Sequence, residues 1–289
     1  FAALDNEGAF LDAYDDLMPS YAAASTELAA TAIQQMQSAT TNRMANTRLQ
    51  GLDEVSVWVQ EIAYGLRGDP SDRGGQEFRG QGFGLAAGID GPLDNGALFG
   101  LSASFLATEA EEPSRPEGEV SSWFAQGNAY LGTALGPIDL DFVGGAGFGR
   151  LRERRFVEIG QNFSAQTEAE WWAYEGHASA RASLPLRVSN WFVMTPQASV
   201  TYVGLGEEGY TEEGGGVGID LEADDSFTER LWGDAGIEFS ARWNMRGGGA
   251  IAPRLYAGYR SNLIDEASER TFRFISPGDE FTLSDATLG

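Results

Sequence analysis

From residue 54 onward, apolar residues alternate with small or polar residues along most of the chain. In residues 82–91 the odd positions carry phenylalanine, leucine, alanine and isoleucine, whereas the even positions carry glycine, alanine and aspartate. The same period of two recurs in three later segments, residues 138–149, 231–243 and 251–260. Alternation over ten or more residues predicts β-strands with one apolar face and one small or charged face.

Short and long connections take turns between these segments. The short ones are turn-like and comprise residues 92–96, 132–137, 189–190 and 246–249. The long ones are polar and comprise residues 68–81, 110–118, 158–167, 204–225 and 265–269. A regular alternation of short and long connections is not expected in a soluble β-sandwich. The pattern therefore predicts a transmembrane antiparallel up-and-down β-barrel, with short turns on one side of the membrane and long loops on the other.

Composition and hydropathy exclude several other classes of protein. A run of 18 apolar residues, which a membrane-spanning helix needs, does not occur, and residues 1–8 do not resemble an export signal. The chain carries 43 acidic and 19 basic residues, so it has few cations to neutralise the phosphates of a nucleic acid. It has no cysteine and one histidine, His177, which argues against thiolate chemistry and metal ligation. We expect no catalytic residue, no metal and no cofactor.

Residues 20–49 contain no glycine or proline and are rich in alanine, glutamine, threonine and methionine, which predicts a helix. Ser20 can act as its N-cap, and a helix of this length would be about 45 Å long. Its middle carries one charge, Glu27, whereas Arg43 and Arg48 lie near its end. Such a helix could pack on a soluble domain or thread a narrow polar channel.

A helix followed by this strand pattern resembles the C-terminal translocator domain of an autotransporter, the type V secretion system of Gram-negative bacteria. The segments that carry the resemblance are residues 20–49, 56–60, 123–149, 251–260 and 274–282. In that family a helical linker enters a 12-stranded barrel and connects it to an exported passenger. The resemblance implies an all-β barrel with the helix in its lumen, residues 1–53 being the linker that threads the pore and residues 54–289 the barrel.

The strand pattern accounts for nine strands and a possible tenth that starts after Glu280. The family's barrel closes with further strands and usually ends in an aromatic residue, whereas this sequence stops at Leu288 and Gly289. We therefore expect a C-terminally truncated barrel with about ten strands present. Asn42 and Asn46 are not adjacent, so the self-cleavage that some relatives perform at an Asn-Asn pair is not expected here.

The resemblance implies an outer-membrane domain that anchors in the membrane and exports an N-terminal passenger. The partners it implies are outer-membrane lipid, a covalently attached passenger upstream and the barrel-assembly machinery. An alternative is a porin-like or OmpA-like barrel that acts as a channel or an anchor, but such a barrel has no need of the helix. An outer-membrane lipase or protease barrel is disfavoured because the chain has a single histidine and no spaced set of nucleophile residues.

Charged residues on the inward strand positions are the candidate site, because they could pair across a water-filled lumen and bind Arg43 and Arg48 of the helix. The predicted pore-lining residues are Glu61, Arg67, Asp139, Asp141, Glu175, His177, Arg181, Asp234, Glu238, Arg242, Arg254 and Arg260. Glu175, His177 and Ser179 share one strand face, but residues two apart lie about 7 Å from each other. We therefore predict a polar ladder there rather than a catalytic triad.

Two further sets of residues have expected places in such a barrel. Aromatic residues near strand ends are predicted to form girdles at the two membrane surfaces: Trp58, Tyr64, Trp123, Tyr130, Trp172, Tyr174, Phe192, Tyr202, Trp243 and Tyr259. The acidic segment 204–225 lacks the spacing of a calcium loop, and we expect it to be a solvated external loop.

Overall fold

The computed structural model describes residues 17, 22–50, 54–68, 78–112, 115–159, 163–245, 250–265, 269–275 and 280–284. Helix α2 (Ala22–Gln50) occupies the segment predicted to be helical, while Ser20 lies outside the described residues. Arg48 in its last turn suits the negative end of the helix dipole. Buried apolar residues recur every three or four positions along it, at Leu28, Ala29, Ala32, Ile33, Met36, Ala39 and Met44. This stripe is the face that α2 packs against the strands.

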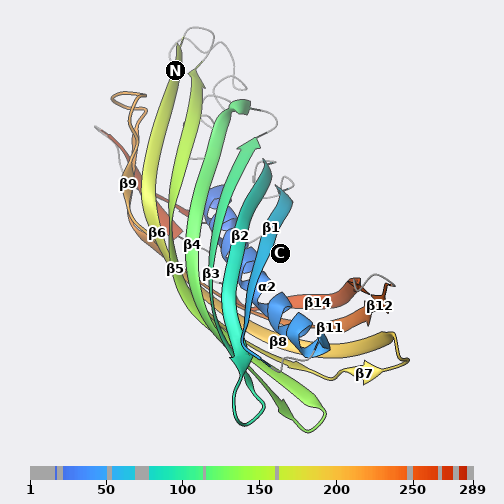
Figure 1. Cartoon of the computed structure of the whole chain (residues 1–289). Coiled ribbons are helices and arrows are strands. Elements are labelled where there is room, and N and C mark those ends of the chain that lie inside the picture. Colours follow the sequence, from blue (N-terminus) through green and yellow to red (C-terminus); the bar gives the residue numbers. More distant parts are fainter. Residues whose placement is uncertain are drawn as a thin grey trace.

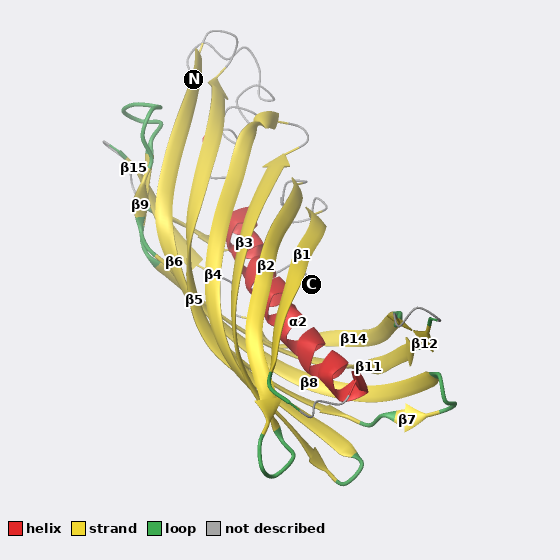
Figure 2. Ribbon diagram, viewed as in Figure 1, coloured by secondary structure: helices red, strands yellow, loops and turns green. Residues whose placement is uncertain are grey.

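The main sheet is antiparallel, and its long strands pair in chain order, as predicted for an up-and-down arrangement. These strands are β1 (Ser56–Gly68), β2 (Phe78–Pro92), β3 (Leu98–Glu112), β4 (Arg115–Leu135), β5 (Ile138–Ile159), β6 (Phe163–Ser183), β8 (Phe192–Glu207), β11 (Ser226–Ala241) and β14 (Arg254–Asp265), with β7 (Leu186–Arg187) paired to β8. The sheet curls around α2 as a trough (Figures 1 and 2). Among the described strands it stays open between β1 and β14, the two ends of the pairing order.

The two ends of the trough differ, as the alternation of short and long connections predicts. At the turn end, β2 and β3 join through residues 93–97, and β4 and β5 join at Gly136. Gly96 and Gly136 have φ values of 78° and 61°, which glycine adopts at little cost. The small hairpin of β12 (Trp243–Asn244) and β13 (Ala250–Ile251) follows β11, and the turn predicted at 246–249 lies outside the described residues.

At the opposite, loop end the strands continue much further than the predicted loops allow. Strands β4, β5 and β6 have 21, 22 and 21 residues, about twice what a strand needs to cross a bilayer. The predicted loops at 110–118 and 158–167 are therefore mostly strand, which corrects the sequence prediction. Alternation of side chains marks a strand but does not mark where the strand leaves the lipid.

A second sheet extends the wall at the loop end. It consists of β9 (Tyr210–Thr211), β10 (Leu221–Ala223), β15 (Glu269–Phe274) and β16 (Phe281–Ser284). The main-chain groups of Glu213 and Glu168 exchange two hydrogen bonds of 2.9 Å, which join this sheet to β6. We call β9, β10, β15 and β16, together with the loop-end halves of β5 and β6, the collar. The strand predicted after Glu280 is β16, and it belongs to the collar rather than to the main sheet.

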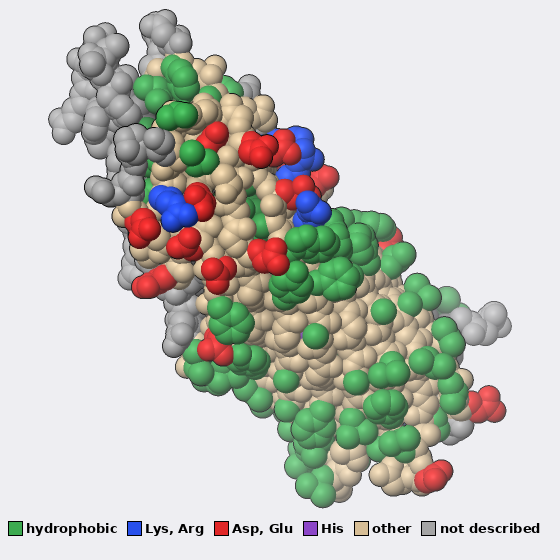
Figure 3. All heavy atoms as spheres, turned by 90° about the vertical axis from the view of Figure 1, so that its left-hand side faces the viewer, with side chains coloured by type: hydrophobic (Ala, Val, Ile, Leu, Met, Phe, Trp, Pro, Cys, Tyr) green, Lys and Arg blue, Asp and Glu red, His purple; other side chains and the backbone are tan. Residues whose placement is uncertain are grey.

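The convex face of the main sheet exposes large apolar side chains. Among them are Phe83, Leu85, Ile89, Phe99, Leu101, Phe105, Phe142 and Phe148. In the space-filling view, a lower region of apolar and tan surface lies below a band of charged side chains (Figure 3). Such a wide apolar face is typical of a surface that contacts lipid or another protein. Among the described residues, no helix combines the length and the hydropathy that a membrane span needs.

Candidate functional site

The candidate site is the concave face of the trough, where α2 lies against the wall. Apart from Leu28, the apolar stripe of α2 forms one buried cluster with wall residues that include Trp58, Ile62, Leu106 and Phe124. These wall residues come from β1, β3 and β4, so one side of the lumen is apolar rather than polar. The apolar contact fixes which face of the helix meets the wall, and charged contacts then fix its position along the pore.

Arg43 makes the first charged contact. Its Nε and Nη2 each donate a 2.7 Å hydrogen bond to the Asp90 carboxylate on β2. The Tyr130 hydroxyl donates to the same carboxylate at 2.8 Å, and Trp58 Nε1 donates to the Tyr130 oxygen at 2.9 Å. Sequence reasoning missed Asp90, although it is the charged residue among the inward positions of 82–91. Bidentate pairing between the Arg43 guanidinium and the Asp90 carboxylate makes this contact both strong and geometrically specific.

Arg48 makes the second charged contact, and here the predicted residues meet. Arg48 pairs with Asp141, donates to the Leu140 carbonyl oxygen at 3.0 Å and lies 3.8 Å from Asp139. Arg181 Nε donates to Asp141 at 3.0 Å from the neighbouring strand β6. One buried carboxylate thus receives two guanidinium groups, one from the helix and one from the wall.

A polar layer lies between these anchors and the loop end. His177 Nδ1 lies 2.9 Å from Glu175 Oε2, and its Nε2 lies 2.7 Å from Asn128 Oδ1. The argument that residues two apart cannot bond was wrong for this pair, because both side chains lie along the sheet. Gly145 and Gly147 make that possible, since a Cβ there would come within 2.6 Å of the His177 ring and of a Glu175 oxygen respectively.

The polar layer also reaches the helix and is completed by amide and hydroxyl groups. Gln126 Nε2 donates to Glu175 at 3.2 Å, and Asn128 Nδ2 donates to Ser102 Oγ at 3.4 Å. Thr40 Oγ1 of α2 lies 3.0 Å from Ser102 Oγ. Glu175 and His177 are therefore held by side-chain amides, as a polar ladder would be.

The strands on the other side of the trough hold α2 at both ends. Arg254 on β14 donates to Asn46 Oδ1 at 3.3 Å and to Glu238 at 3.2 Å. Near the loop end, Arg230 on β11 pairs with Glu27 at 2.9 Å. The remaining predicted residues of these strands, Asp234 and Arg260, pair with each other at 2.8 Å on the concave side. Arg230 was missed because it lies one position before the segment whose alternation was analysed.

Three predicted pore-lining residues do not lie in the lumen. Glu61 and Arg67 share the convex face of β1 with the exposed Val57 and Val59. The buried inward residues Trp58 and Ile62 of β1 are apolar and pack in one cluster with α2, so choosing the charged face as the inner one was wrong for this strand. Arg242 is exposed just past the end of β11, where its main-chain N–H donates to the Trp191 carbonyl oxygen.

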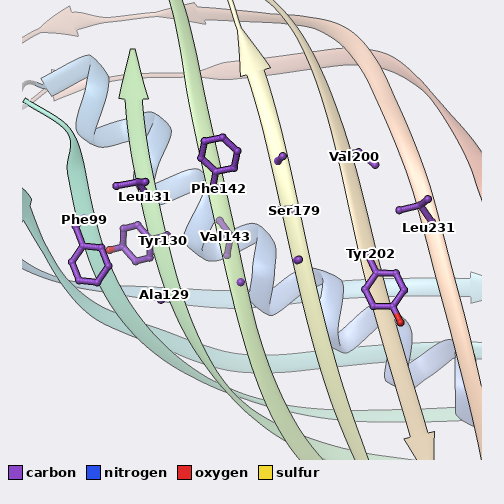
Figure 4. Close-up of a pocket in the computed structure, with 13 residues that line it drawn as sticks. Phe99, Ala129, Tyr130, Leu131, Phe142, Val143, Ser179, Val200, Tyr202 and Leu231 are labelled. Atoms are coloured by element: carbon purple, nitrogen blue, oxygen red, sulfur yellow. The ribbon is translucent and has the colours of Figure 1, made fainter. Parts of the chain in front are cut away.

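Aromatic residues on the convex face form two clusters. Phe105, Trp123, Phe148 and Trp172 have ring centroids 5.7–6.2 Å apart near the band of charges, whereas Trp191, Phe192, Phe239 and Trp243 cluster near the turn end. A shallow apolar hollow lies in the sheet between them, lined by residues such as Phe99, Phe142 and Leu231 (Figure 4). Trp58, Tyr64 and Tyr130, also predicted for girdles, instead face the lumen and hydrogen-bond within it.

Residues of the predicted acidic loop are buried in the collar, which corrects the expectation that this segment is solvated. Arg155 on β5 binds Glu212 through Nε at 3.0 Å and Nη2 at 2.5 Å, and both side chains are 2% exposed. Nη2 also donates to the Ile219 carbonyl oxygen at 2.9 Å, and Nη1 donates to the Leu17 carbonyl oxygen at 3.1 Å. Within this acidic segment, the Glu212 carboxylate is thus neutralised by an arginine far away in the sequence.

Glu207 links the collar to the helix. It accepts hydrogen bonds of 2.9 Å from Trp171 Nε1 and from Thr26 Oγ1 of α2. The Arg270 guanidinium lies 3.7 Å from Glu207 and 4.7 Å from the centre of the Tyr210 ring, which itself stacks on Trp171 at 4.3 Å. Burial raises the pKa of the Tyr210 hydroxyl well above its usual value. The collar is thus a tightly packed structure around the start of the helix.

Comparisons with known proteins match this architecture. The family model described as the autotransporter beta-domain matches residues 57–288. The solved translocator domain of the autotransporter NalP from Neisseria meningitidis is 13% identical, with a TM-score of 0.57 over 86% of this chain and 90% of that one. The beta domain of the Bordetella autotransporter BrkA is 15% identical, with a TM-score of 0.51 over 81% and 94% of the two chains. No curated protein sequence matches at a significant level.

Proposed function

Since this chain belongs to the autotransporter β-domain family, we propose that residues 1–53 form the linker that threads the pore and residues 54–289 form the barrel wall. The family places the chain in the outer membrane of Gram-negative bacteria, as the translocator that exports a passenger linked upstream. The turn end then faces the periplasm and the collar faces the exterior. The helix would mark the path that the passenger has taken.

The observation that carries this proposal is the set of contacts that hold α2 along the trough. Arg43 and Arg48 pair with carboxylates on β2 and β5, whereas Glu27 pairs with an arginine on β11. Strands from both sides of the trough therefore bind one helix. A helix that merely rested on the surface would not need partners on both sides. A porin-like or OmpA-like barrel would not need them either.

The apolar convex face indicates which partners this domain would have. Lipid would cover the apolar surface between the two aromatic clusters, since aromatic residues favour the interfaces of a bilayer. Insertion of such a sheet would require the barrel-assembly machinery. We further propose that the domain catalyses no reaction, because Glu175 and His177 are engaged by Gln126 and Asn128 rather than by a nucleophile. The predicted pore-lining roles of Asp139, Glu175, His177 and the other concave residues belong to the same proposal.

Removing the helix tests the proposal directly. Deleting residues 22–50 from the full-length protein should raise its single-channel conductance sharply in planar lipid bilayers, because the deletion empties the lumen. Heat-modifiable migration in gels would show that the wall still folds. A conductance that does not change, in a variant that is still heat-modifiable, would mean that the helix does not occupy the pore and would overturn the proposal.

A further inference from the structure

Glu153 is the buried charged group whose role the lumen anchors do not explain. It lies on the inner face of β5, two positions before Arg155, and is 2% exposed. Neither of its carboxyl oxygens has a hydrogen-bond partner among the described residues. A buried polar group without a partner costs free energy, and a buried charge costs more. The collar therefore contains a carboxyl group that is destabilising there when it is ionised.

The groups that face Glu153 explain why it lacks a partner. Of the two cations that interact with it, Arg155 donates to both oxygens of Glu212 and to the carbonyl oxygens of Leu17 and Ile219. From the other collar strands, Arg270 donates to the Glu208 and Asp224 carbonyl oxygens and stacks on Tyr210. Glu207 and Glu212 add two negative charges. Glu153 thus lies among two occupied cations, two carboxylates and a phenol.

This environment sets the protonation of Glu153. Burial raises the pKa of its carboxyl to about 8, with Glu212 adding to the rise and Arg155 opposing it. The carboxyl is therefore mostly neutral at neutral pH. Its ionised form would attract the Arg155 guanidinium away from Glu212 and the Leu17 carbonyl oxygen, since Glu153 lies two positions from Arg155 on the same face of β5 and interacts with its charge.

Arg155 contacts the chain just ahead of the helix. Leu17 is buried against Val157 and Ile219, and Arg155 binds its main-chain carbonyl oxygen at 3.1 Å. Helix α2 begins at Ala22. A contact to a carbonyl oxygen does not depend on the side chain that occupies the position. Arg155 could therefore bind any segment that lies at the mouth of the pore.

We propose that Glu153 and Arg155 form a proton-controlled clamp on the main chain at Leu17. The neutral Glu153 carboxyl leaves the guanidinium on the Leu17 carbonyl oxygen, and loss of its proton to water draws the guanidinium toward the new carboxylate. The clamp rests on the proposed function in one respect, that Leu17 lies where the linker leaves the lumen. In this site Glu153 binds a proton, and Arg155 binds a main-chain carbonyl oxygen.

Proton linkage gives the direction of the pH dependence. The pKa of Glu153 is about 8 in the closed collar, against an ordinary value of 4.5 when the carboxyl reaches water. The closed state therefore binds one more proton than the open state between these two values. Raising the pH through this window should favour opening by about tenfold per pH unit, and above about pH 8 the effect should level off.

A cysteine at position 17 measures this opening, because the chain has no cysteine of its own. The full-length protein carrying Leu17→Cys would be alkylated in outer-membrane vesicles with a slow thiol reagent. The reference is Val217→Cys, since Val217 is 78% exposed and reports the intrinsic pH dependence of the thiol. The ratio of the two rates should rise about 100-fold from pH 5.5 to pH 7.5. A ratio that stays flat would overturn the clamp.

A second variant assigns the effect to Glu153. Glu153→Gln, added to Leu17→Cys, should hold the ratio near its acid value at every pH, whereas Glu158→Gln, an exposed control on the same strand, should keep the rise. Glu153→Leu serves the same purpose if the glutamine variant fails to insert. A rise that persists in either Glu153 variant would assign the pH dependence to another group and overturn the proposal. The alkylation ratio does not depend on the conductance of the helix-deletion variant. The two experiments can therefore overturn the clamp and the proposed function independently.

Discussion

The lumen and the collar both use arginine and carboxylate groups to hold the helical segment, but the helix arginines Arg43 and Arg48 and the collar arginine Arg155 bind in different ways. In the lumen the two helix arginines, Arg43 and Arg48, bind the wall carboxylates Asp90 and Asp141. In the collar the arginine belongs to the wall, and Arg155 binds a carbonyl oxygen of the segment. The contacts of Arg43 and Arg48 therefore depend on side chains of the segment, whereas the Arg155 contact depends only on its main chain.

The balance of charge also differs between the two regions. Asp141 in the lumen pairs with both Arg48 and Arg181, so two cations lie beside its carboxylate. In the collar, Glu153 has no hydrogen-bond partner among the residues that the structure describes, and it interacts with two further carboxylates. A carboxylate paired with two cations suits a permanent anchor, and a buried carboxyl group that pairs with no cation among the described residues suits a contact that responds to conditions. The predictions below test this difference.

The largest loss of stability is expected for Arg155→Met. This change leaves the Glu212 carboxylate buried without its guanidinium, and breaking a buried pair in this way costs about 3–5 kcal/mol. Urea unfolding in lipid vesicles, followed by heat-modifiable migration, would measure it. A loss below about 1 kcal/mol would show that the collar is hydrated rather than dry.

Arg48→Met should cost less, about 1.5–3 kcal/mol, which is the range for hydrogen bonds to charged groups. Arg48 is 22% exposed, and Asp141 keeps its pair with Arg181 when Arg48 is removed. The same unfolding assay compares the two variants. If Arg48→Met were as destabilising as Arg155→Met, the contrast between a doubly paired and a singly paired carboxylate would fail.

Glu153→Gln should change stability in a pH-dependent way that no lumen variant shares. Because the pKa of Glu153 is raised to about 8 in the folded collar, its contribution is most favourable at acid pH and is lost as the pH rises toward 8. The variant should therefore be more stable than the parent at pH 8.5 and close to it at pH 5. Unfolding midpoints at the two pH values measure this, with Glu158→Gln as the matched control. Equal effects at both values would contradict it.

The smallest effect is expected on the convex face. Arg152 pairs with Glu168 across β5 and β6, and the two side chains are 45% and 44% exposed. Exposed pairs of this kind contribute about 0.2–1 kcal/mol and weaken in salt. Arg152→Gln should stay within that range in the unfolding assay, and a larger loss would mean that this band of charges is shielded from water.

Much of the fold follows from the sequence because a period of two assigns every residue of a strand to one of two faces. The helix, the antiparallel order and the meeting of Arg48 with Asp139 and Asp141 were predictable on that basis. The role of Asp90 was equally predictable from the sequence. A charged residue at an inward position, on a face that otherwise carries small residues, indicates a charged partner on the helix.

The rest could not be predicted because periodicity does not say which face is inside or where the lipid ends. In β1 the apolar residues Trp58 and Ile62 face inward onto the helix, so Glu61 was placed on the wrong side. The collar could not be seen either, since its strands are short and Glu212 finds Arg155 only after folding. Contacts between residues far apart in the chain leave no local signal.

The central claim, that α2 lies in the lumen against the wall, is tested most directly by a cysteine pair. Thr40 Oγ1 and Ser102 Oγ lie 3.0 Å apart, one on the helix and one on β3, and the chain has no native cysteine to confuse the result. Thr40→Cys with Ser102→Cys should form a disulfide in outer-membrane vesicles under mild oxidation, detected by mass spectrometry of the linked peptides. Asn42→Cys with Ser102→Cys, whose helix residue is exposed, should not. A folded Thr40/Ser102 variant that forms no disulfide, or equal yields from both pairs, would contradict the account.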